Sequence, residues 1–288
     1  MPTSSQCDPV TRFAPSPSGY LHLGHAYAAL TAANKARLGG GEFLLRLEDI
    51  DHERCRSEFE DMILTDLQWL GLTWKKPILR QSERHDAYQA ALSLLFENDL
   101  LYPCFCTRKD IRREIESAGA APHGPDGPLY PGTCRSLSDS IRNQRISDGE
   151  GYALRLDMKN AASQAGRLEW NDIEAGPNIA NPDQFGDIVL ARKDSPTSYH
   201  LSVVVDDHFQ GVTLVTRGED LFPATHVHRL LQALLTLNTP DYLHHKLIVG
   251  PDGKKFSKRD QSVTLHTLRH HGKMPDDIYA ELGLSPAR

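Results

Sequence analysis

Two histidines stand at the start of an alanine-rich apolar run near the N-terminus, and their spacing suits phosphate binding. His22 and His25 are three residues apart, enclose Gly24 and follow the turn-forming stretch PSPSG. Residues 24–38 are helix-forming, so the pair is expected on a first helical turn, where unpaired N–H groups and the helix dipole attract anions. Residues three apart share a helix face, and the glycine lets a flat ligand approach the backbone. Taken alone, the pair is also compatible with solvated surface histidines.

A second candidate for phosphate chemistry is the lysine-rich stretch GKKFSKRD at residues 253–260. Lys255 and Lys258 are three residues apart, and Ser257 lies between them. Glycine upstream gives the backbone conformational freedom. A lysine side chain is a compact charge on a flexible stem, which can neutralise charge that develops on a transferring phosphoryl group. In isolation, such a loop is also typical of solvated surface.

Cysteines supply a third candidate site. Three of the five lie close together in the sequence: Cys104, Cys106 and Cys134. Zinc usually takes four ligands, and either His123 or Tyr130 could supply the fourth, histidine being the commoner zinc ligand. Free thiols in a reducing cytosol are the alternative. Cys7 and Cys55 stand apart and are expected to be free thiols, because an odd cysteine count without a signal sequence argues against a disulfide framework.

The composition is that of an ordinary globular protein. The chain has 288 residues, 39% hydrophobic and 24% charged, which suits one large domain or a core with one insertion. A net charge of −6 argues against indiscriminate polyanion binding but allows a local basic face. No apolar stretch approaches the roughly 20 residues of a membrane span, and the N-terminus lacks a secretory pattern. We therefore expect a cytoplasmic protein without membrane contact.

Strand and helix patterns alternate in the first third of the chain. Strand patterning occurs at 11–14 and within GEFLLRLEDID, and helical periodicity at 24–38, at 58–71 and again after residue 84. Such alternation is typical of an α/β fold, in which helices cover both faces of a parallel sheet.

This pattern breaks between residues 104 and 182, where basic helical residues and a Gly/Pro-rich stretch predict an insertion. We therefore expect a core of residues 1–103 and 183–250, an inserted α/β subdomain at 104–182 that holds zinc, and a lysine loop with a helical segment at 251–288. In the second core segment, Val203–Val205 is predicted to be a buried strand.

The histidine pair and the lysine loop together resemble the two signature motifs of class I aminoacyl-tRNA synthetases. RFAPSPSGYLHLGHAYAAL and RLEDID resemble the N-terminal part of glutamyl-tRNA synthetases, and VVVDDHFQGVTLVTRGEDL and KFSKRD extend the resemblance along nearly the whole chain. The resemblance implies a Rossmann-type nucleotide-binding core, which activates glutamate by attack of its carboxylate on the α-phosphorus of ATP with Mg²⁺ present. Such chemistry requires positioning and charge stabilisation and no protein nucleophile.

Site residues are implied by the same resemblance. The expected ATP-binding residues are His22, Gly24, His25, Lys255, Ser257 and Lys258, and three of these, His22, His25 and Lys258, are the expected catalytic residues. The expected glutamate-binding residues are Arg12, Phe13, Ala14, Pro15, Ser16, Glu48, Tyr199 and Arg217.

Roles within the glutamate site follow from charge. Arg12 suits a bidentate clamp on the substrate's side-chain carboxylate, and the resemblance implies that Arg217 shares this task. Tyr199 would hydrogen-bond the substrate, and Glu48 would accept its ammonium group. The alternatives are a structural ion pair for Arg217, a core aromatic for Tyr199 and a surface carboxylate for Glu48.

Two further features indicate the branch of the family. The chain ends at residue 288, 30 positions beyond Lys258, so no anticodon-binding domain of typical size is expected after it. Together with the pattern Cys-x-Cys…Tyr-x₃-Cys, this resembles the glutamyl-Q tRNA(Asp) synthetases. The resemblance implies tRNA-independent activation of glutamate, transfer to the queuosine base at the wobble position of tRNA(Asp), and one structural zinc ion. Similarity of YPGTCR to a tyrosine-containing zinc site favours Tyr130 over His123.

The resemblance also implies a tRNA partner for the insertion. The insertion would contact the anticodon stem-loop of tRNA(Asp), and its basic residues are candidates for phosphate contacts: Arg108, Lys109, Arg112 and Arg113. We expect a monomer that binds ATP, glutamate and this tRNA. The alternatives are a truncated glutamyl-tRNA synthetase that charges the 3′ end of tRNA(Glu), and a catalytically inactive tRNA-binding module.

Replacing Lys258 by alanine should lower the rate of glutamate-dependent ATP–pyrophosphate exchange by on the order of 100-fold or more, because a cation that stabilises developing phosphate charge is lost. The melting temperature should change little, since a loop side chain is removed. Exchange kinetics equal to those of the wild type would contradict the assigned role of Lys258.

Overall fold

A computed structural model of the chain describes residues 8–117, 123–125, 127–248 and 264–285. Its N-terminal part is a parallel sheet of order β1-β2-β3, built from β1 (Val10–Phe13), β2 (Glu42–Leu47) and β3 (Lys75–Arg80). Helices α1 (Leu23–Leu38) and α2 (Ser57–Trp69) connect these strands and pack their apolar faces on the sheet. The parallel sheet expected from the alternating pattern is therefore confirmed.

A four-stranded sheet lies beside β1, in the order β11 (Leu214–Gly218), β12 (Asp241–His245), β8 (Glu169–Asp172) and β9 (Gly176–Ile179). β11 begins beside β1, where the Thr213 N–H donates to the Val10 carbonyl at 3.0 Å. β12 pairs with β11 in parallel. β12 in turn pairs in parallel with β8, which forms a hairpin with β9.

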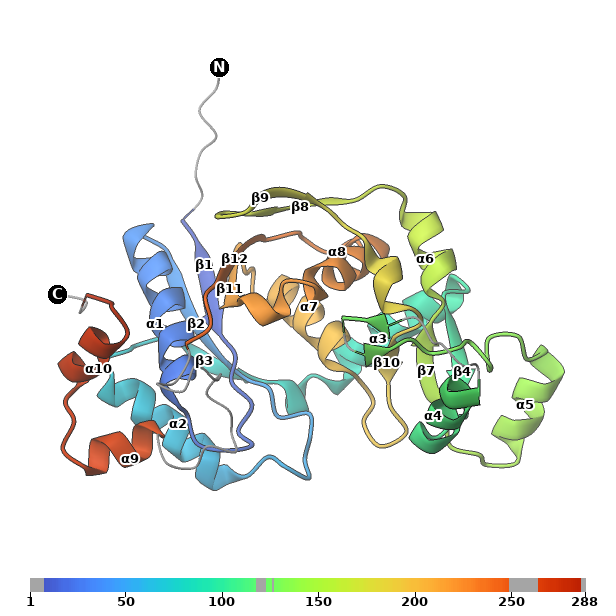
Figure 1. The fold of residues 1–288 in the computed structure, drawn as a ribbon, viewed down its shortest axis with the longest axis horizontal. Helices are drawn as coiled ribbons and strands as arrows, with labels where there is room; N and C mark the ends of the chain where they lie inside the picture. The colour runs from blue at the N-terminus through green and yellow to red at the C-terminus, as the bar shows by residue number, and fades with distance from the viewer. Residues whose placement is uncertain (1–7, 118–122, 126, 249–263, 286–288) are drawn as a thin grey trace, which may run out of the picture.

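An antiparallel sheet of order β10-β7-β4 lies at the other side of the molecule (Figure 1). It consists of β4 (Leu101–Cys104), β7 (Ala153–Leu156) and β10 (Val189–Ala191). The strands β4 and β10 lie at the two ends of the expected insertion and pair with β7, a strand from within it. The strands β8 and β9 also belong to the insertion by sequence, but β8 pairs with β12 of the core.

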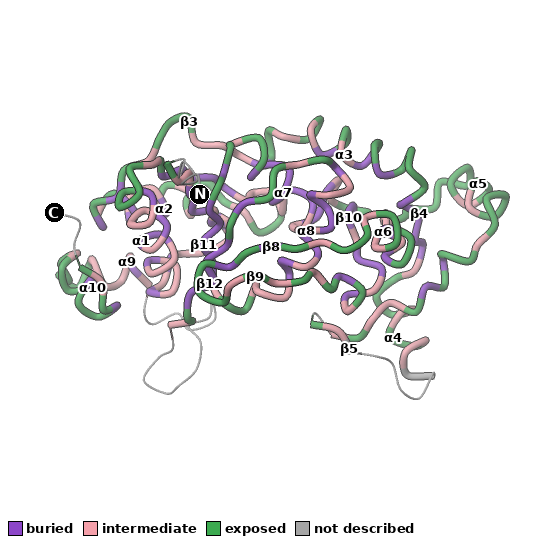
Figure 2. The backbone as a smooth tube through the Cα atoms, turned by 90° about the horizontal axis from the view of Figure 1, so that it is seen from above, coloured by how far each residue is buried: buried purple, intermediate pink, exposed green. Residues whose placement is uncertain are grey.

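Four helices share one apolar core beside the antiparallel sheet: α3 (His85–Glu97), α6 (Met158–Ala165), α7 (Tyr199–Phe209) and α8 (Ala224–Leu234). Smaller elements cover the far end: α4 (Arg108–Ser117), β5 (His123–Gly124), β6 (Gly127–Pro128) and α5 (Asp139–Ser147). Figure 2 shows α5 at one extremity, and none of its residues is buried. Three short 3₁₀ helices span Gln81–Glu83, Pro182–Phe185 and Glu219–Leu221.

The expected strand at Val203–Val205 is wrong, because these valines lie in α7. Helix α7 packs against α3, α8 and β10, so it is covered on several sides and buries consecutive residues, as a central strand also would. The next two residues, Asp206 and Asp207, are buried as well and meet polar partners in different directions. Tertiary packing therefore overrides the β preference of valine.

The C-terminal helices return to the N-terminal sheet. α9 (Leu265–His270) and α10 (Pro275–Glu281) pack beside α2 and α1, and the Tyr279 hydroxyl donates to the Leu70 carbonyl at 3.2 Å. No helix within the described parts of the chain is long and apolar enough to cross a membrane.

Candidate active site and metal centre

The loop after β1 ends in a capped helix start that contains both candidate histidines. His22 is the N-cap of α1, and its Nδ1 accepts from the Gly24 N–H at 3.1 Å. The Nδ1 of His25 accepts from the His22 N–H at 3.2 Å, and the ring centroids are 3.8 Å apart. Because both Nδ1 atoms are acceptors, a neutral ring carries its proton on Nε2. Each ring therefore has a donor suited to a phosphate oxygen.

Glycine at position 24 has a steric reason that the sequence did not reveal. A Cβ at this position would lie 3.0 Å from Cε1 and 3.1 Å from Nδ1 of His22. Among the described residues, the ring of the helix cap is thus what lies closest to this position. A side chain at position 24 would require the His22 ring to shift by a few tenths of an ångström.

The expected lysine loop lies outside the described residues, and so do Lys255, Ser257 and Lys258. Its two flanks are described. Ile248 packs against the core around α1, and Thr264 forms an antiparallel bridge with His22. The Leu265 N–H also donates to the Leu21 carbonyl at 2.8 Å. The chain therefore resumes directly beside the histidine turn.

Arg12 on β1 is part of a buried ion cluster. Its Nε and Nη2 donate to the two carboxylate oxygens of Asp207 on α7 at 2.9 and 3.2 Å. Arg46 on β2 donates to the same carboxylate at 2.8 Å and lies 3.5 Å from Glu48. Burial tends to raise the pKa of Asp207, but Arg12 and Arg46 outweigh burial and hold this pKa below its usual value. Burial raises the pKa of Glu48, against the opposing effect of the two arginines.

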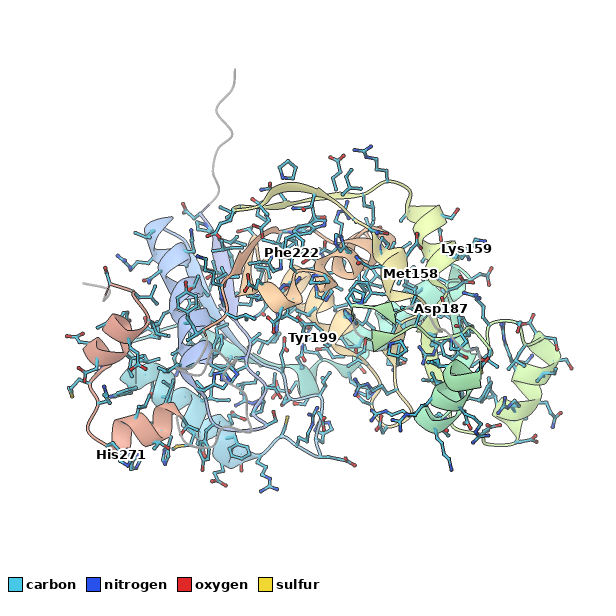
Figure 3. The ribbon with its side chains drawn as sticks, viewed as in Figure 1. Met158, Lys159, Asp187, Tyr199, Phe222 and His271 are labelled. Carbon is cyan, nitrogen blue, oxygen red and sulfur yellow. The ribbon has the colours of Figure 1, made fainter. Side chains whose placement is uncertain are left out.

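Arg217 on β11 is buried among uncharged partners. Its Nε donates to Nε2 of His244 at 3.1 Å, and its Nη1 donates to Nδ1 of His228 at 3.0 Å. Nη1 also lies 3.4 Å from the Tyr199 hydroxyl, and Nη2 donates to the Thr225 hydroxyl. Figure 3 shows Tyr199 at the start of α7, between the parallel sheet and the antiparallel sheet.

Histidines around Arg217 remain uncharged over a wide pH range. Burial, followed by the charge of Arg217, lowers the pKa of His244 to about 4 and that of His200 to about 4. The same two causes, in the same order, bring the pKa of His228 well below its usual value. The Asp172 carboxylate, 2.8 Å from Nδ1 of His244, does not reverse this effect.

The structure brings several expected glutamate-binding residues into one neighbourhood. Arg12, Glu48 and Arg217 all act electrostatically on the Tyr199 hydroxyl, whose pKa is raised mainly by burial. The Phe13 side chain instead packs in the core beside α1. The Pro15 carbonyl accepts from the Glu48 N–H at 3.0 Å.

Two of the expected residues lie at the edge of this neighbourhood. Ala14 is half-buried. Ser16 is also half-buried, and its hydroxyl lies 3.3 Å from the Ser18 hydroxyl.

Sequence reasoning missed the partners of the two arginines. They are Asp207, Thr216, Thr225, His228 and His244, together with Arg46, which shares Asp207, and Asp172, which bonds to His244. A usable signal existed for Arg46 and Asp207, since an arginine inside an apolar strand and an acidic pair after three valines both require buried partners. No comparable signal marked Asp172 or His228.

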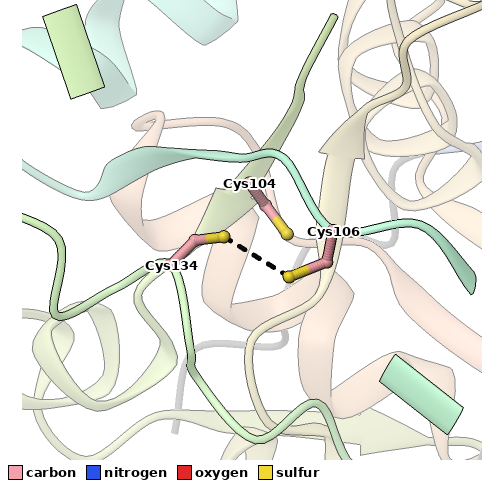
Figure 4. A group of neighbouring side chains, drawn as sticks. All are labelled: Cys104, Cys106 and Cys134. Atoms are coloured by element: carbon pink, nitrogen blue, oxygen red, sulfur yellow. Dashed lines mark hydrogen bonds between the residues drawn. The ribbon is translucent and has the colours of Figure 1, made fainter. Parts of the chain in front are cut away.

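The cysteine cluster is assembled as the sequence suggested. The Sγ atoms of Cys104, Cys106 and Cys134 all lie within 4.8 Å of one another (Figure 4). The Tyr130 hydroxyl is 3.4 Å from Cys104 Sγ and 3.5 Å from Cys106 Sγ. His123 lies in β5, and its side chain is outside what the structure describes.

The distances in the cluster fit a tetrahedral zinc ion. Zn–S bonds of about 2.3 Å and Zn–O bonds of about 2.0 Å imply S···S and S···O separations of roughly 3.8 and 3.5 Å. The sulfurs of Cys106 and Cys134 are 3.4 Å apart, and all three sulfurs lie within 4.8 Å of one another. Among the described residues, three sulfurs and one phenol oxygen thus match the required donor set.

One cavity is lined by a residue from each candidate site. It has a volume of about 310 Å³, and its lining includes Tyr199, His200, Tyr130 and Ile111. Arg155 also lines the cavity and lies over the Tyr130 ring, 3.9 Å from its centroid. Tyr199 of the glutamate neighbourhood and Tyr130 beside the cysteines thus border the same cavity.

A parallel sheet whose first strand leads into the capped histidine turn is the arrangement of a class I synthetase core. The family model for tRNA synthetases class I (E and Q), catalytic domain, matches residues 9–285, and the chain belongs to this family. Within the family, the glutamyl-Q tRNA(Asp) synthetase of Rhodobacter capsulatus is 48% identical over 280 residues, which cover 96% of this chain and 100% of that protein. The chain is accordingly a ligase of the aminoacyl-tRNA synthetase type, with relatives named glutamyl-Q tRNA(Asp) synthetase.

Longer synthetases are also similar to this chain. The glutamate–tRNA ligase of Aquifex aeolicus is 38% identical over 281 residues, which are 96% of this chain but 57% of the ligase. A crystal structure of glutamate-tRNA synthetase from Elizabethkingia anophelis superposes with a TM-score of 0.81 at 29% identity, covering 96% of this chain and 61% of that one. This chain therefore spans little more than half the length of these enzymes.

Acidification should destabilise the fold between about pH 6.5 and pH 4. Folded His200 and His244 stay neutral down to a pKa of about 4, whereas the unfolded chain takes up protons at the usual value of 6.5. Because the unfolded state then binds more protons, the free energy of unfolding falls as the pH drops. Circular dichroism should record a lower melting temperature at about pH 5 than at about pH 7.5.

Protonation of Asp66 should have the opposite effect on the free energy of unfolding and so provides a control for this experiment. Burial raises the pKa of Asp66 to about 6, so its protonation stabilises the fold as the pH falls. The variant Asp66→Asn should therefore lose stability more steeply on acidification than the wild type. Melting temperatures independent of pH in both proteins would contradict the histidine assignment.

Proposed function

We propose that the protein activates L-glutamate with ATP, without tRNA, and transfers the glutamyl group to the queuosine base at the wobble position of tRNA(Asp). The observation that carries the glutamate specificity is Arg217, a buried cation whose partners among the described residues are all uncharged. A buried charge without a counter-ion is costly unless a ligand supplies the opposite charge. The side-chain carboxylate of glutamate would supply it.

The substrate carboxylate would lie between Arg217 and Tyr199, whose hydroxyl can donate its proton to the carboxylate. Arg12 contributes as a second cation. A guanidinium has five N–H bonds, and Asp207 and Thr216 accept three of those of Arg12. The other N–H bonds can therefore reach the substrate. Glu48 accepts the substrate ammonium, and its position after β2 is held by the bond to the Pro15 carbonyl.

Activation then consists of attack by an α-carboxylate oxygen on the α-phosphorus of ATP, with pyrophosphate as leaving group. His22 and His25 donate to ATP phosphates through Nε2, and Lys255 and Lys258 would neutralise the charge that develops on them. Mg²⁺ bound with ATP would share in neutralising that charge. Ser257 would donate a hydrogen bond to ATP.

Transfer requires an acceptor base next to the activated carboxyl group. The cavity lined by Tyr199 and Tyr130 opens beside the glutamate neighbourhood and supports entry of the acceptor from the side of the cysteine cluster. Four exposed cations of α4 lie on the same part of the molecule and suit the phosphates of an anticodon stem-loop: Arg108, Lys109, Arg112 and Arg113.

A truncated glutamyl-tRNA synthetase that charges tRNA(Glu) is the second candidate, favoured by the 38% identity to the glutamate–tRNA ligase. Labelled glutamate separates the two. With ATP, label should transfer to queuosine-containing tRNA(Asp) and not to unmodified tRNA(Asp) or tRNA(Glu). Label on tRNA(Glu) alone would establish the second candidate, and no glutamate-dependent ATP–pyrophosphate exchange would indicate a binding module without activity.

We also propose that Cys104, Cys106, Tyr130 and Cys134 hold one structural zinc ion. Bound zinc would join two segments of the chain, since two ligands come from the end of β4 and the loop directly after it, and two come from the stretch after β6. A phenolate is a costly ligand near neutral pH, because the usual phenol pKa is about 10. The close approach of the Tyr130 hydroxyl to two sulfurs supports it as the fourth ligand.

Metal analysis of the purified protein should find about one zinc ion per chain. Tyr130→Phe should lose zinc to a chelator faster than the wild type, because one ligand is removed. Tyr152→Phe is the matched control, since Tyr152 contacts Phe105 by its ring and not the sulfurs. Normal zinc retention in Tyr130→Phe, with loss in His123→Ala, would assign the fourth position to His123 instead.

A further inference from the structure

Buried arginines of the active-site region fall into two groups by the charge of their partners. Arg12 and Arg46 both meet the Asp207 carboxylate. Arg217 instead contacts hydroxyl groups and histidine rings. The nearby Asp172 carboxylate bonds to the far side of the His244 ring and not to Arg217 itself. A histidine thus stands where a direct carboxylate contact would cancel the charge of Arg217.

The hydrogen-bond directions around Arg217 follow from the guanidinium, which can only donate. Because Nε2 of His244 accepts from Arg217, the proton of the neutral ring is on Nδ1, which donates to Asp172 at 2.8 Å. The Nδ1 of His228 accepts from Arg217, so its Nε2 donates to Nδ1 of His200 at 3.2 Å. Both rings are thereby fixed as neutral acceptors.

The negative charge of Asp172 is itself satisfied by other donors. One oxygen accepts from the backbone N–H groups of Glu174 and Ala175 at 2.9 and 2.8 Å. The other accepts from the backbone N–H of His244 as well as from its ring. Asp172 therefore orients His244 without direct contact with Arg217.

We propose that His228 and His244 are positioning residues that hold the Arg217 guanidinium with neutral acceptors and so reserve its charge for the side-chain carboxylate of the substrate. This inference rests on the proposed glutamate activation. It assigns the discrimination between glutamate and glutamine to uncharged protein groups: a neutral amide gains little from Arg217, whereas a carboxylate gains a charge-assisted bond.

The contacts also fix the plane of the guanidinium. Nε is held from β12, and Nη1 and Nη2 are held from α8 through His228 and Thr225. Including the Tyr199 contact, these partners engage four of the five N–H bonds. The remaining N–H and the Tyr199 hydroxyl are left to receive the substrate carboxylate.

A pair of isosteric variants separates this role from simple packing. Asn and Asp have the same shape, and each offers an oxygen near the position of Nδ1 of histidine. His228→Asn keeps a neutral acceptor, whereas His228→Asp places a carboxylate against Arg217 and satisfies its charge. A packing role predicts the same effect for both variants.

Steady-state ATP–pyrophosphate exchange on the full chain should measure KM and kcat for glutamate, glutamine and ATP. We expect His228→Asp to raise the KM for glutamate on the order of 100-fold and to lower the preference for glutamate over glutamine by a similar factor. The KM for ATP should stay within about threefold, and His228→Asn should stay within about fivefold of the wild type for glutamate. His226→Asp is the charge control on the same helix, since its ring accepts from the Asn181 N–H.

Equal effects of His228→Asn and His228→Asp, or an unchanged glutamate preference in His228→Asp, would overturn the inference while leaving the proposed function in place. A wild-type protein that neither binds glutamate in calorimetry nor supports exchange would overturn both. If His228→Asp does not fold, Thr225→Asp and Thr225→Asn make the same comparison at Nη2.

Discussion

The contact between Asp207 and two arginines is the constraint on which the rest of the site depends. It joins β1, β2 and α7, which belong to segments almost 200 residues apart in sequence. Two guanidinium groups and a carboxylate would each be costly to bury alone, so the three are stable only together. The parallel sheet and the helix that carries Tyr199 are therefore held in one arrangement by charge as well as by apolar packing.

Two arginines of similar burial have different tasks because of their neighbours. Arg12 has a carboxylate partner within its own fold, whereas Arg217 has histidine and hydroxyl partners. The acceptors of Arg12 include a charged carboxylate, whereas those of Arg217 are neutral. Whether a buried arginine serves to bind substrate or to hold the fold together thus depends more on the formal charge of its neighbours than on its being an arginine.

The sequence predicted the α/β class, the parallel sheet and the helix start at the histidine pair, because these depend on local periodicity and on turn residues between positions 11 and 47. It did not predict that His22 caps this helix. It failed at Val203–Val205, since a helix packed on several sides buries consecutive residues as a central strand does. The partners of Arg217 could not be predicted either. Apart from Tyr199, they come from β12 and α8, and only the folded topology brings these elements to β11.

Neighbouring carboxylates on α7 have one more consequence. Consecutive helical residues point about 100° apart; Asp206 binds Tyr88 and Gln81, while Asp207 binds the arginines of the sheet. Because these two carboxylates are held in different directions, α7 cannot rotate about its own axis. Tyr199 lies about two turns, roughly 12 Å, before them. The direction in which its phenol ring faces is therefore set by carboxylate contacts about two helical turns away.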